Sequence, residues 1–194
     1  MFVSPPRRNA SARSYTLIEL IMVMGVLALA AAMLVPHLVG RDSLTVQAAV
    51  RLIIADLSFA QTDALANQGF RRVVFYPDGS GYCLIRVPSA GWVTPADLED
   101  GSVDYVYDPL GNMGRYVVNF VEDERFEGVR ISSVEIEGVT LPPDRPEITY
   151  DQLGGTVSPG GGPGTGGNIT LTFDDENYRI DIAAFTGKLT VTEL

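Results

Sequence analysis

The stretch Ser14–Leu20 reads SYTLIEL, and the residues from Leu20 to Gly40 carry no formal charge. A run of this length is typical of a membrane helix, because about 20 helical residues at roughly 1.5 Å each cover the ~30 Å hydrocarbon core of a bilayer. The sequence therefore predicts a helix over residues 15–40 that crosses a membrane once.

A short basic segment precedes this helix. Residues 1–14 contain Arg7, Arg8 and Arg13 and no acid. Because arginine and lysine beside a membrane helix are retained in the cytoplasm, we expect residues 1–14 to stay on the cytoplasmic side and the rest of the chain to be exported.

Two ordinary export signals explain this segment less well. Ala28–Ala32 resembles the small-residue cleavage site of a secretory signal, but the apolar run continues past it to Val39, and Glu19 sits at its start. The pair Arg7–Arg8 resembles a twin-arginine signal, but the apolar residues that should follow it closely are missing.

Glu19 is the informative residue of this segment. A carboxylate inside an apolar span costs on the order of a few kcal/mol unless it is paired or reaches the interface, so an acid at such a position usually has a function. The simpler interpretation is an acid at a helix N-terminus, where the helix dipole favours negative charge.

The motif Ser14–Leu20 resembles the class III signal of type IV pilins and pseudopilins, in which Gly and an aromatic residue precede Thr-Leu-Ile-Glu-Leu. The resemblance implies that a prepilin peptidase cuts between Ser14 and Tyr15 and methylates the new N-terminus. Glu19 would then be the fifth mature residue. Pro36 would be the 22nd, where the family also has proline. Ser14 departs from the usual glycine.

The resemblance also implies roles in fibre assembly. Glu19 of one subunit would neutralise the terminal ammonium at Tyr15 of its neighbour, which satisfies two charges in a low-dielectric setting. Pro36 removes a backbone donor and should kink the helix. We expect the neighbouring His37 to be an interfacial side chain.

The apolar pattern becomes amphipathic after Gly40. Residues 41–69 form the amphipathic half of what we predict to be one long helix, which ends at Gly69. The apolar positions at helical spacing predict the face that packs on the head, and they are Val46, Val50, Ile53, Leu57, Ala60 and Ala64.

Residues 70–194 form a head in which short alternating runs replace the helical pattern. A hairpin is predicted around residues 77–81, and the last three strands should form a meander with one buried face. The predicted strands are 71–76, 82–87, 116–120, 129–136, 168–173, 178–183 and 188–192. In two of them the buried faces should be Ile169, Leu171 and Phe173, and Tyr178, Ile180 and Ile182.

The predicted fold class is therefore α+β, with a long N-terminal helix and a mostly antiparallel β-sheet head. This layout resembles the H-type minor pseudopilins of type II secretion and their pilus relatives, the GspH/FimT family. Those proteins pack two sheets on the helix and close with a turn and strand like Phe185–Leu189.

Two stretches, 88–114 and 142–167, are predicted to be irregular. The glycines of Ser158–Gly167 suggest a phosphate-binding loop, but no Lys-Ser or Lys-Thr follows, so a flexible surface loop is favoured. Asp174–Glu176 could bind calcium, but three acids in a hairpin are more often a solvated turn. Trp92 should cover the core or contact a neighbouring subunit.

Composition excludes much familiar chemistry. One cysteine, Cys83, excludes an internal disulfide, and one histidine excludes a Cys/His zinc cluster. We expect Cys83 to be a small buried residue. No catalytic, cofactor-binding or metal-binding residue is predicted, and the chain is not expected to be an enzyme.

Net charge disfavours nucleic acid as a partner. The chain has 14 basic and 24 acidic residues, and without the three leader arginines 11 basic residues remain, a formal charge of −13. A local basic patch could still come from Arg71, Arg72 and Arg179.

The function that we predict is a minor pseudopilin, a structural subunit of the periplasmic pseudopilus of type II secretion. It would be a single-pass protein of the bacterial inner membrane with its head in the periplasm. Its partners would be the prepilin peptidase, other pseudopilins or pilins in a helical fibre, and the inner-membrane assembly platform. The alternative is a minor pilin of a type IV pilus that takes up DNA.

Overall fold

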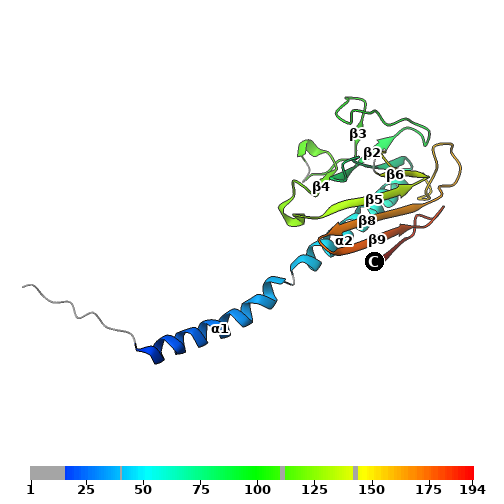
Figure 1. Cartoon of the computed structure of the whole chain (residues 1–194). Helices are drawn as coiled ribbons and strands as arrows, with labels where there is room; N and C mark the ends of the chain where they lie inside the picture. The colour runs from blue at the N-terminus through cyan, green and yellow to red at the C-terminus, as the bar shows by residue number, and fades with distance from the viewer. Residues whose placement is uncertain (1–15, 40, 110–111, 142–143) are drawn as a thin grey trace, which may run out of the picture. The chain divides into compact units, whose positions relative to one another are not determined.

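The chain is an α+β protein (Figure 1). The computed structural model describes residues 16–39, 41–109, 112–141 and 144–194, without the side chains of residues 33–43 and 112. The chain divides into two units, Met1–Arg41 and Asp42–Leu194. The second unit, the head, holds all the strands that the structure describes.

Helix α1 spans Leu17–Val39, which is 23 residues. Thr16 caps it, because its Oγ1 accepts a hydrogen bond of 3.3 Å from the backbone N–H of Glu19. Threonine followed three residues later by glutamate is the sequence pattern of a capping box. The SYTLIEL motif therefore contains its own helix start.

The prediction of one long helix through residue 69 is wrong. Helix α1 ends at Val39 and helix α2 is a separate element over Arg41–Ala66, while Gly40 between them lies outside the described residues. Glycine is the weakest helix former after proline, and this chain places Pro36 four residues before it.

The second helix also ends earlier than predicted. Gln68, with φ of 46°, takes the left-handed position after the last turn, and Gly69 N–H then bonds to the carbonyl of Ala64. Such a closing bond after a left-handed residue is a common helix end. The expected stop at Gly69 is therefore displaced toward Gln68.

The head contains two five-stranded sheets, and every described strand pairing is antiparallel. Sheet 1 has the order β3-β2-β1-β7, and β4 also pairs with β2. Its strands are β1 Phe70–Phe75, β2 Gly81–Val87, β3 Asp104–Tyr105, β4 Val117–Asn119 and β7 Glu147–Tyr150. Sheet 2 has the order β10-β9-β8-β5-β6. Its strands are β5 Arg130–Ile136, β6 Val139–Leu141, β8 Gly167–Phe173, β9 Glu176–Ile182 and β10 Leu189–Glu193.

The main core lies between α2 and side chains of both sheets. The predicted apolar face of α2 is confirmed, because all six of its residues are at most 4% exposed. The predicted inward faces of β8 and β9 are confirmed as well, with Phe173 only partly buried. Burial of each large aliphatic side chain contributes about 1.5–3 kcal/mol, so this single core supplies much of the stability of the head.

A second, smaller core covers the other face of sheet 1. Val74, Cys83, Ile85 and Val87 are buried there, and Trp92 packs against them from the following loop. This core confirms the predicted burial of Cys83 and shows that Trp92 covers apolar side chains of its own chain. Burial raises the pKa of the Cys83 thiol to about 12, so it is a packing residue and not a reactive thiolate.

Three short strands lie where the sequence analysis predicts no strand. They are β3, β6 and β7, and β7 begins directly after Pro146. Proline-rich sequence argues against a strand, but Glu147–Tyr150 pairs with β1 as the last named strand of sheet 1, and a proline just before such an edge strand is tolerated.

The glycine-rich segment before β8 is hydrogen-bonded. Ser158 N–H donates to the carbonyl of Gly162, and Gly164 N–H donates to that of Thr156. Gly166 has φ of 77°, and a Cβ there would collide with the carbonyl oxygen of Ile182. Only glycine meets both requirements at residue 166.

The close approach at residue 166 predicts a loss of stability on substitution, with a matched control nearby. Gly166→Ala should lower the free energy of unfolding by about 2 kcal/mol or more, because the new methyl group meets backbone that cannot move away. Gly160→Ala should change it by less than about 0.5 kcal/mol, since a Cβ at residue 160 meets open space. Urea unfolding of the full chain in detergent micelles, followed by circular dichroism, measures both. Equal effects of the two substitutions would contradict the assignment.

Candidate functional site

The first candidate site is the start of α1, where the sequence placed Glu19. Glu19 lies in the first turn of the helix, and its side chain is exposed within its own unit. An acid in this turn is favoured by the positive end of the helix dipole. Its local role as an N-terminal acid is thus compatible with a further role toward a partner.

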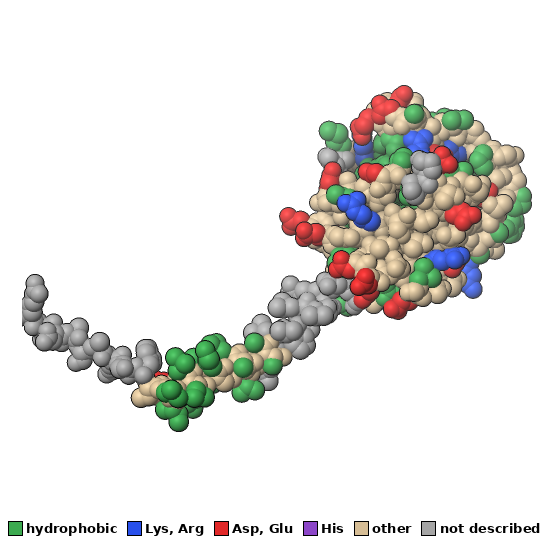
Figure 2. Space-filling view, in the orientation of Figure 1, with side chains coloured by type: hydrophobic (Ala, Val, Ile, Leu, Met, Phe, Trp, Pro, Cys, Tyr) green, Lys and Arg blue, Asp and Glu red, His purple; other side chains and the backbone are tan. Residues whose placement is uncertain are grey.

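The described part of α1 is apolar on all sides. Every residue of Thr16–Ala32 is exposed within its unit, and Figure 2 shows hydrophobic side chains along the visible face of this helix. Ten large ones are more than half exposed, from Leu17 to Leu29. At about 2 kcal/mol for each such side chain, transfer out of water would gain on the order of 10–20 kcal/mol. This gain exceeds the few kcal/mol that one carboxylate costs near the membrane interface.

The other predicted site residues of this segment are placed only in part. Ser14 and Tyr15 lie outside the described residues. The backbone of Pro36 is within α1, which continues to Val39. The predicted kink at Pro36 and the predicted cut at Ser14–Tyr15 remain predictions.

One helix of the described chain is long and apolar enough to cross a membrane. It is α2 over Leu44–Ala66, with a mean hydropathy of 1.2, and the described apolar part of α1, Leu17–Ala32, is shorter. The apolar face of α2 is buried in the head core, which is typical of the core helix of a globular domain. The prediction that α1 crosses a membrane stays a prediction.

The second candidate site is a buried carboxylate on α2. Asp56 is 3% exposed, and two tyrosine hydroxyls donate to it, from Tyr82 at 2.5 Å and from Tyr116 at 2.7 Å. Both carboxylate oxygens are therefore bonded to side chains of the sheet 1 region. This cluster fixes α2 to β2 and to the residue before β4.

The environment of Asp56 favours its protonated form. Burial raises the pKa of Asp56 above its ordinary value of 3.8, although the two tyrosine hydrogen bonds oppose the shift and nearby Asp108 adds to it. Asp56 and Tyr116 line one side of an open cleft that Asp108 and Glu122 also line. The negative charge of Asp108 adds to the cost of ionising Asp56.

The arginines of the predicted basic patch do not form one. Arg71 is 5% exposed and pairs with Asp63 of α2, and Arg72 is 2% exposed. Arg72 pairs with Glu147 at 3.1 Å and donates to the carbonyls of Ala90 and Trp92.

Arg179, the third arginine of that set, is exposed and pairs with Asp181. Two of the three cations are therefore structural, and they are compensated inside the head. A nucleic-acid phosphate could reach only Arg179 among them.

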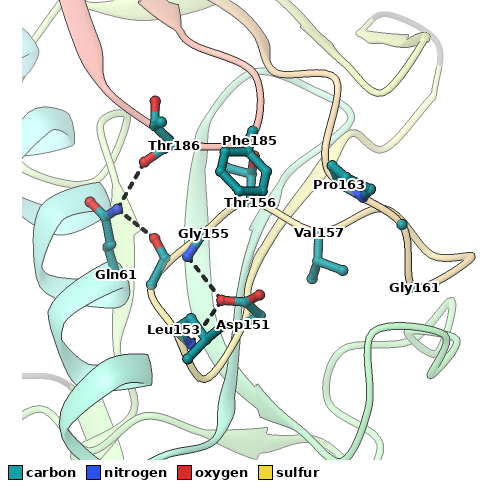
Figure 3. A pocket seen from close by; sticks show the side chains of 12 residues that line it. Gln61, Asp151, Leu153, Gly155, Thr156, Val157, Gly161, Pro163, Phe185 and Thr186 are labelled. Carbon is teal, nitrogen blue, oxygen red and sulfur yellow. Dashed lines mark hydrogen bonds between the residues drawn. The ribbon is translucent and has the colours of Figure 1, made fainter.

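Residues of α2 and of the loops before β8 and before β10 line a cavity of about 450 Å³. Figure 3 shows these side chains from close by. Gln61 of α2 joins the two loops, because its Nε2 donates to the carbonyl of Gly154 at 2.5 Å and to that of Thr186 at 3.0 Å. Phe185, with φ of 64°, and Leu153 stand exposed at its border.

The chemistry of this cavity is that of a packing site. Asp151 accepts hydrogen bonds from the N–H groups of Leu153 and Gly155, so its carboxylate holds the turn. The described residues that line the cavity do not include a nucleophilic side chain next to a base. The cluster is absent from the sequence-based predictions, although Asp151 before Gly154-Gly155 is a recognisable turn signal.

The predictions on metal binding concern the acids and the few His and Cys side chains. Its His, Cys, Asp and Glu side chains form no group of three or more that could hold an ion. Of the three acids that suggested calcium, Asp174 and Asp175 form the tight turn between β8 and β9, where Asp174 has φ of 47° and is exposed, and Glu176 begins β9.

The buried carboxylate should make stability depend on pH. A carboxyl whose pKa is higher in the folded chain binds its proton more tightly there, so its contribution to stability is complete below pH 3.8 and is lost as the pH rises through the raised pKa. Asp56→Asn should remove this loss, so that between about pH 4 and 7 the free energy of unfolding falls less than in the natural chain.

Urea unfolding at several pH values measures the difference. Asp175→Asn, at an exposed turn position, is the control and should keep the slope of the natural chain. Parallel profiles for the natural chain and Asp56→Asn would show that the carboxyl does not titrate in this way.

No family model, curated protein or solved structure matches the chain. The chain combines an acid in the first turn of an apolar helix with a head of two antiparallel sheets joined to a second helix. Of the sequence-predicted site residues, only Glu19 is described with its side chain.

Proposed function

We propose that the chain is a minor pseudopilin, a structural subunit of a short periplasmic fibre that serves type II protein secretion. In this proposal a prepilin peptidase removes residues 1–14 and methylates Tyr15. Helix α1 then holds the subunit in the bacterial inner membrane until the assembly platform adds it to the fibre. The chain performs no catalysis itself.

The observation that carries the proposal is Glu19 in the first turn of an otherwise apolar helix, inside the motif SYTLIEL. After cleavage, the new ammonium group would lie four residues before this carboxylate. Within one helix the two groups are a turn apart, so a stack of staggered helices lets Glu19 of one subunit meet Tyr15 of the next. A carboxylate left without such a partner in the fibre would be strongly destabilising.

The architecture of the head also supports the proposal. Two antiparallel sheets share one core with α2, and this is the arrangement that the resemblance to H-type pseudopilins led us to expect. Its acidic surface suits a periplasmic structural role better than contact with nucleic acid.

The alternative, a minor pilin that binds DNA for uptake, uses the same processing and the same membrane helix. It differs in needing an exposed basic surface on the head. Burial and pairing of Arg71 and Arg72 remove two of the three arginines available for that surface. The secretion role is therefore the one that we favour.

Processing of the N-terminus is the first test. Mass spectrometry of the mature protein from the native membrane should find a chain that begins at Tyr15 and carries one methyl group on its amine. Ser14→Gly should be cleaved at least as fast as the natural chain, because glycine is the residue that the peptidase usually meets. A mature chain that starts at any other residue would contradict the proposal.

Assembly is the second test. Glu19→Ala and Glu19→Gln should both be cleaved normally, yet crosslinking to neighbouring subunits in the fibre should fall by about tenfold or more, since an unpaired buried charge costs several kcal/mol. The glutamine variant keeps the size of the side chain and removes only its charge. Asp175→Ala, an exposed acid of the head, is the control and should assemble normally. Normal assembly of Glu19→Gln would refute the pairing.

A further inference from the structure

Strand β10 is an unprotected edge of sheet 2. It pairs with β9 on one side, and Figure 1 draws it at the margin of the sheet, close to the end of the described chain. The other edge strands are short or covered. Strands β3, β4 and β6 have two or three residues, and Val157 N–H bonds to the free side of β7 at Thr149.

The hydrogen-bond pattern shows which backbone groups of β10 point outward. Ala183 N–H donates to the carbonyl of Lys188, and Leu194 N–H donates to that of Asn177. These two pairs set the alternation along the ladder, so the N–H and C=O groups of Leu189, Val191 and Glu193 face away from β9. Among the described residues no backbone partner meets them.

On the face of sheet 2 that contacts the core, the side chains of β10 are only partly buried. Val191 lies opposite the fully buried Ile180, yet it is 42% exposed because the sheet ends beside it. Leu189 lies opposite Ile182 and is only partly buried. An additional strand with apolar residues on this face would complete the cover.

Natural edges are usually blunted by proline, a bulge, an inward charge or a covering segment. Strand β10 pairs in regular register over all five residues and contains no proline. Its charges are at its ends, Lys188 just before it and Glu193 as its last residue. Between them the edge is neutral, on a head that is otherwise strongly acidic.

From these observations we infer that the outer edge of β10 binds an extended segment of another protein as an added antiparallel strand. Antiparallel pairing continues the pattern of the sheet and lets opposite residues exchange two hydrogen bonds each. Charge complementarity orients the segment, with a basic residue opposite Glu193 and an acid opposite Lys188. Apolar residues lie opposite Val191 and Leu189.

In the fibre, this segment belongs to an adjoining subunit, so the biological partner rests on the proposed function. The recognition itself does not, because it needs only the edge of β10. A test of peptide binding to the outer edge of β10 therefore fails or succeeds independently of fibre assembly.

The probe is the acetylated and amidated hexapeptide Lys-Thr-Val-Thr-Val-Glu, titrated into the full chain in detergent micelles. Its first lysine aligns with Glu193 and its two valines with Val191 and Leu189. NMR should show saturable binding, with slower amide exchange at Leu189 and Val191 and unchanged exchange at Val93 in a distant loop. Absence of saturable binding, or unchanged exchange at the two edge amides, would overturn the inference.

Two matched pairs separate strand addition from loose apolar contact. N-methylation of the two valines blocks the amides that face β10 and should weaken binding by about tenfold or more, whereas N-methylation of the two threonines should leave the affinity within about threefold. Val191→Lys should weaken it similarly, and Val93→Lys, at a residue that is 82% exposed, should not. Equal binding of the two methylated peptides would overturn the inference, whatever the protein variants do.

Discussion

One helix serves both sheets of the head. The apolar side chains of α2 belong to one buried cluster that also contains inward residues from strands of sheet 1 and sheet 2. Every other feature of the head follows from this shared core, because its removal would leave two sheets with one uncovered face each. The polar side chains of α2 then act at the margins of the core. Asp56 binds two tyrosines, Asp63 pairs with Arg71, and Gln61 closes the loops beside the cavity.

The charged side chains of this acidic protein fall into two groups, those on the surface and those buried with partners. Most acids lie on the surface, where their mutual repulsion is screened. The buried charges have specific partners, as Arg72 shows with Glu147, Thr149 and the carbonyls of the covering loop. Glu19 belongs to neither group, since its side chain is exposed in the first turn of an otherwise apolar helix and, among the described residues, it lies beside the helix N-terminus. This difference is the reason for seeking its partner on another subunit.

Periodicity predicted the parts of the fold that have one buried face. The stripe of α2 and the alternation in β8 and β9 were visible because polar residues mark the opposite side. In sheet 1 the hairpin of β1 and β2 was also predicted, to within one residue at each strand end, but both strands are buried on both faces, so the burial of Arg71 and Arg72 was missed. The strands that were missed have two to four residues, too few for any period to appear. The cluster around Gln61 depends on tertiary contacts between α2 and two distant loops, which local sequence does not contain.

The second core has a practical consequence for anyone who follows the folding of this protein. Trp92 is the single tryptophan of the chain, and it sits on the outer face of sheet 1, held there through the backbone by the guanidinium of Arg72. Its fluorescence therefore reports on the second, smaller core on this face of sheet 1 and not on the main core that contains α2. If that smaller core loosens first, emission will change while the far-ultraviolet dichroism of α2 and both sheets is still native. Agreement between the two signals would mean instead that the two cores melt as one cooperative body.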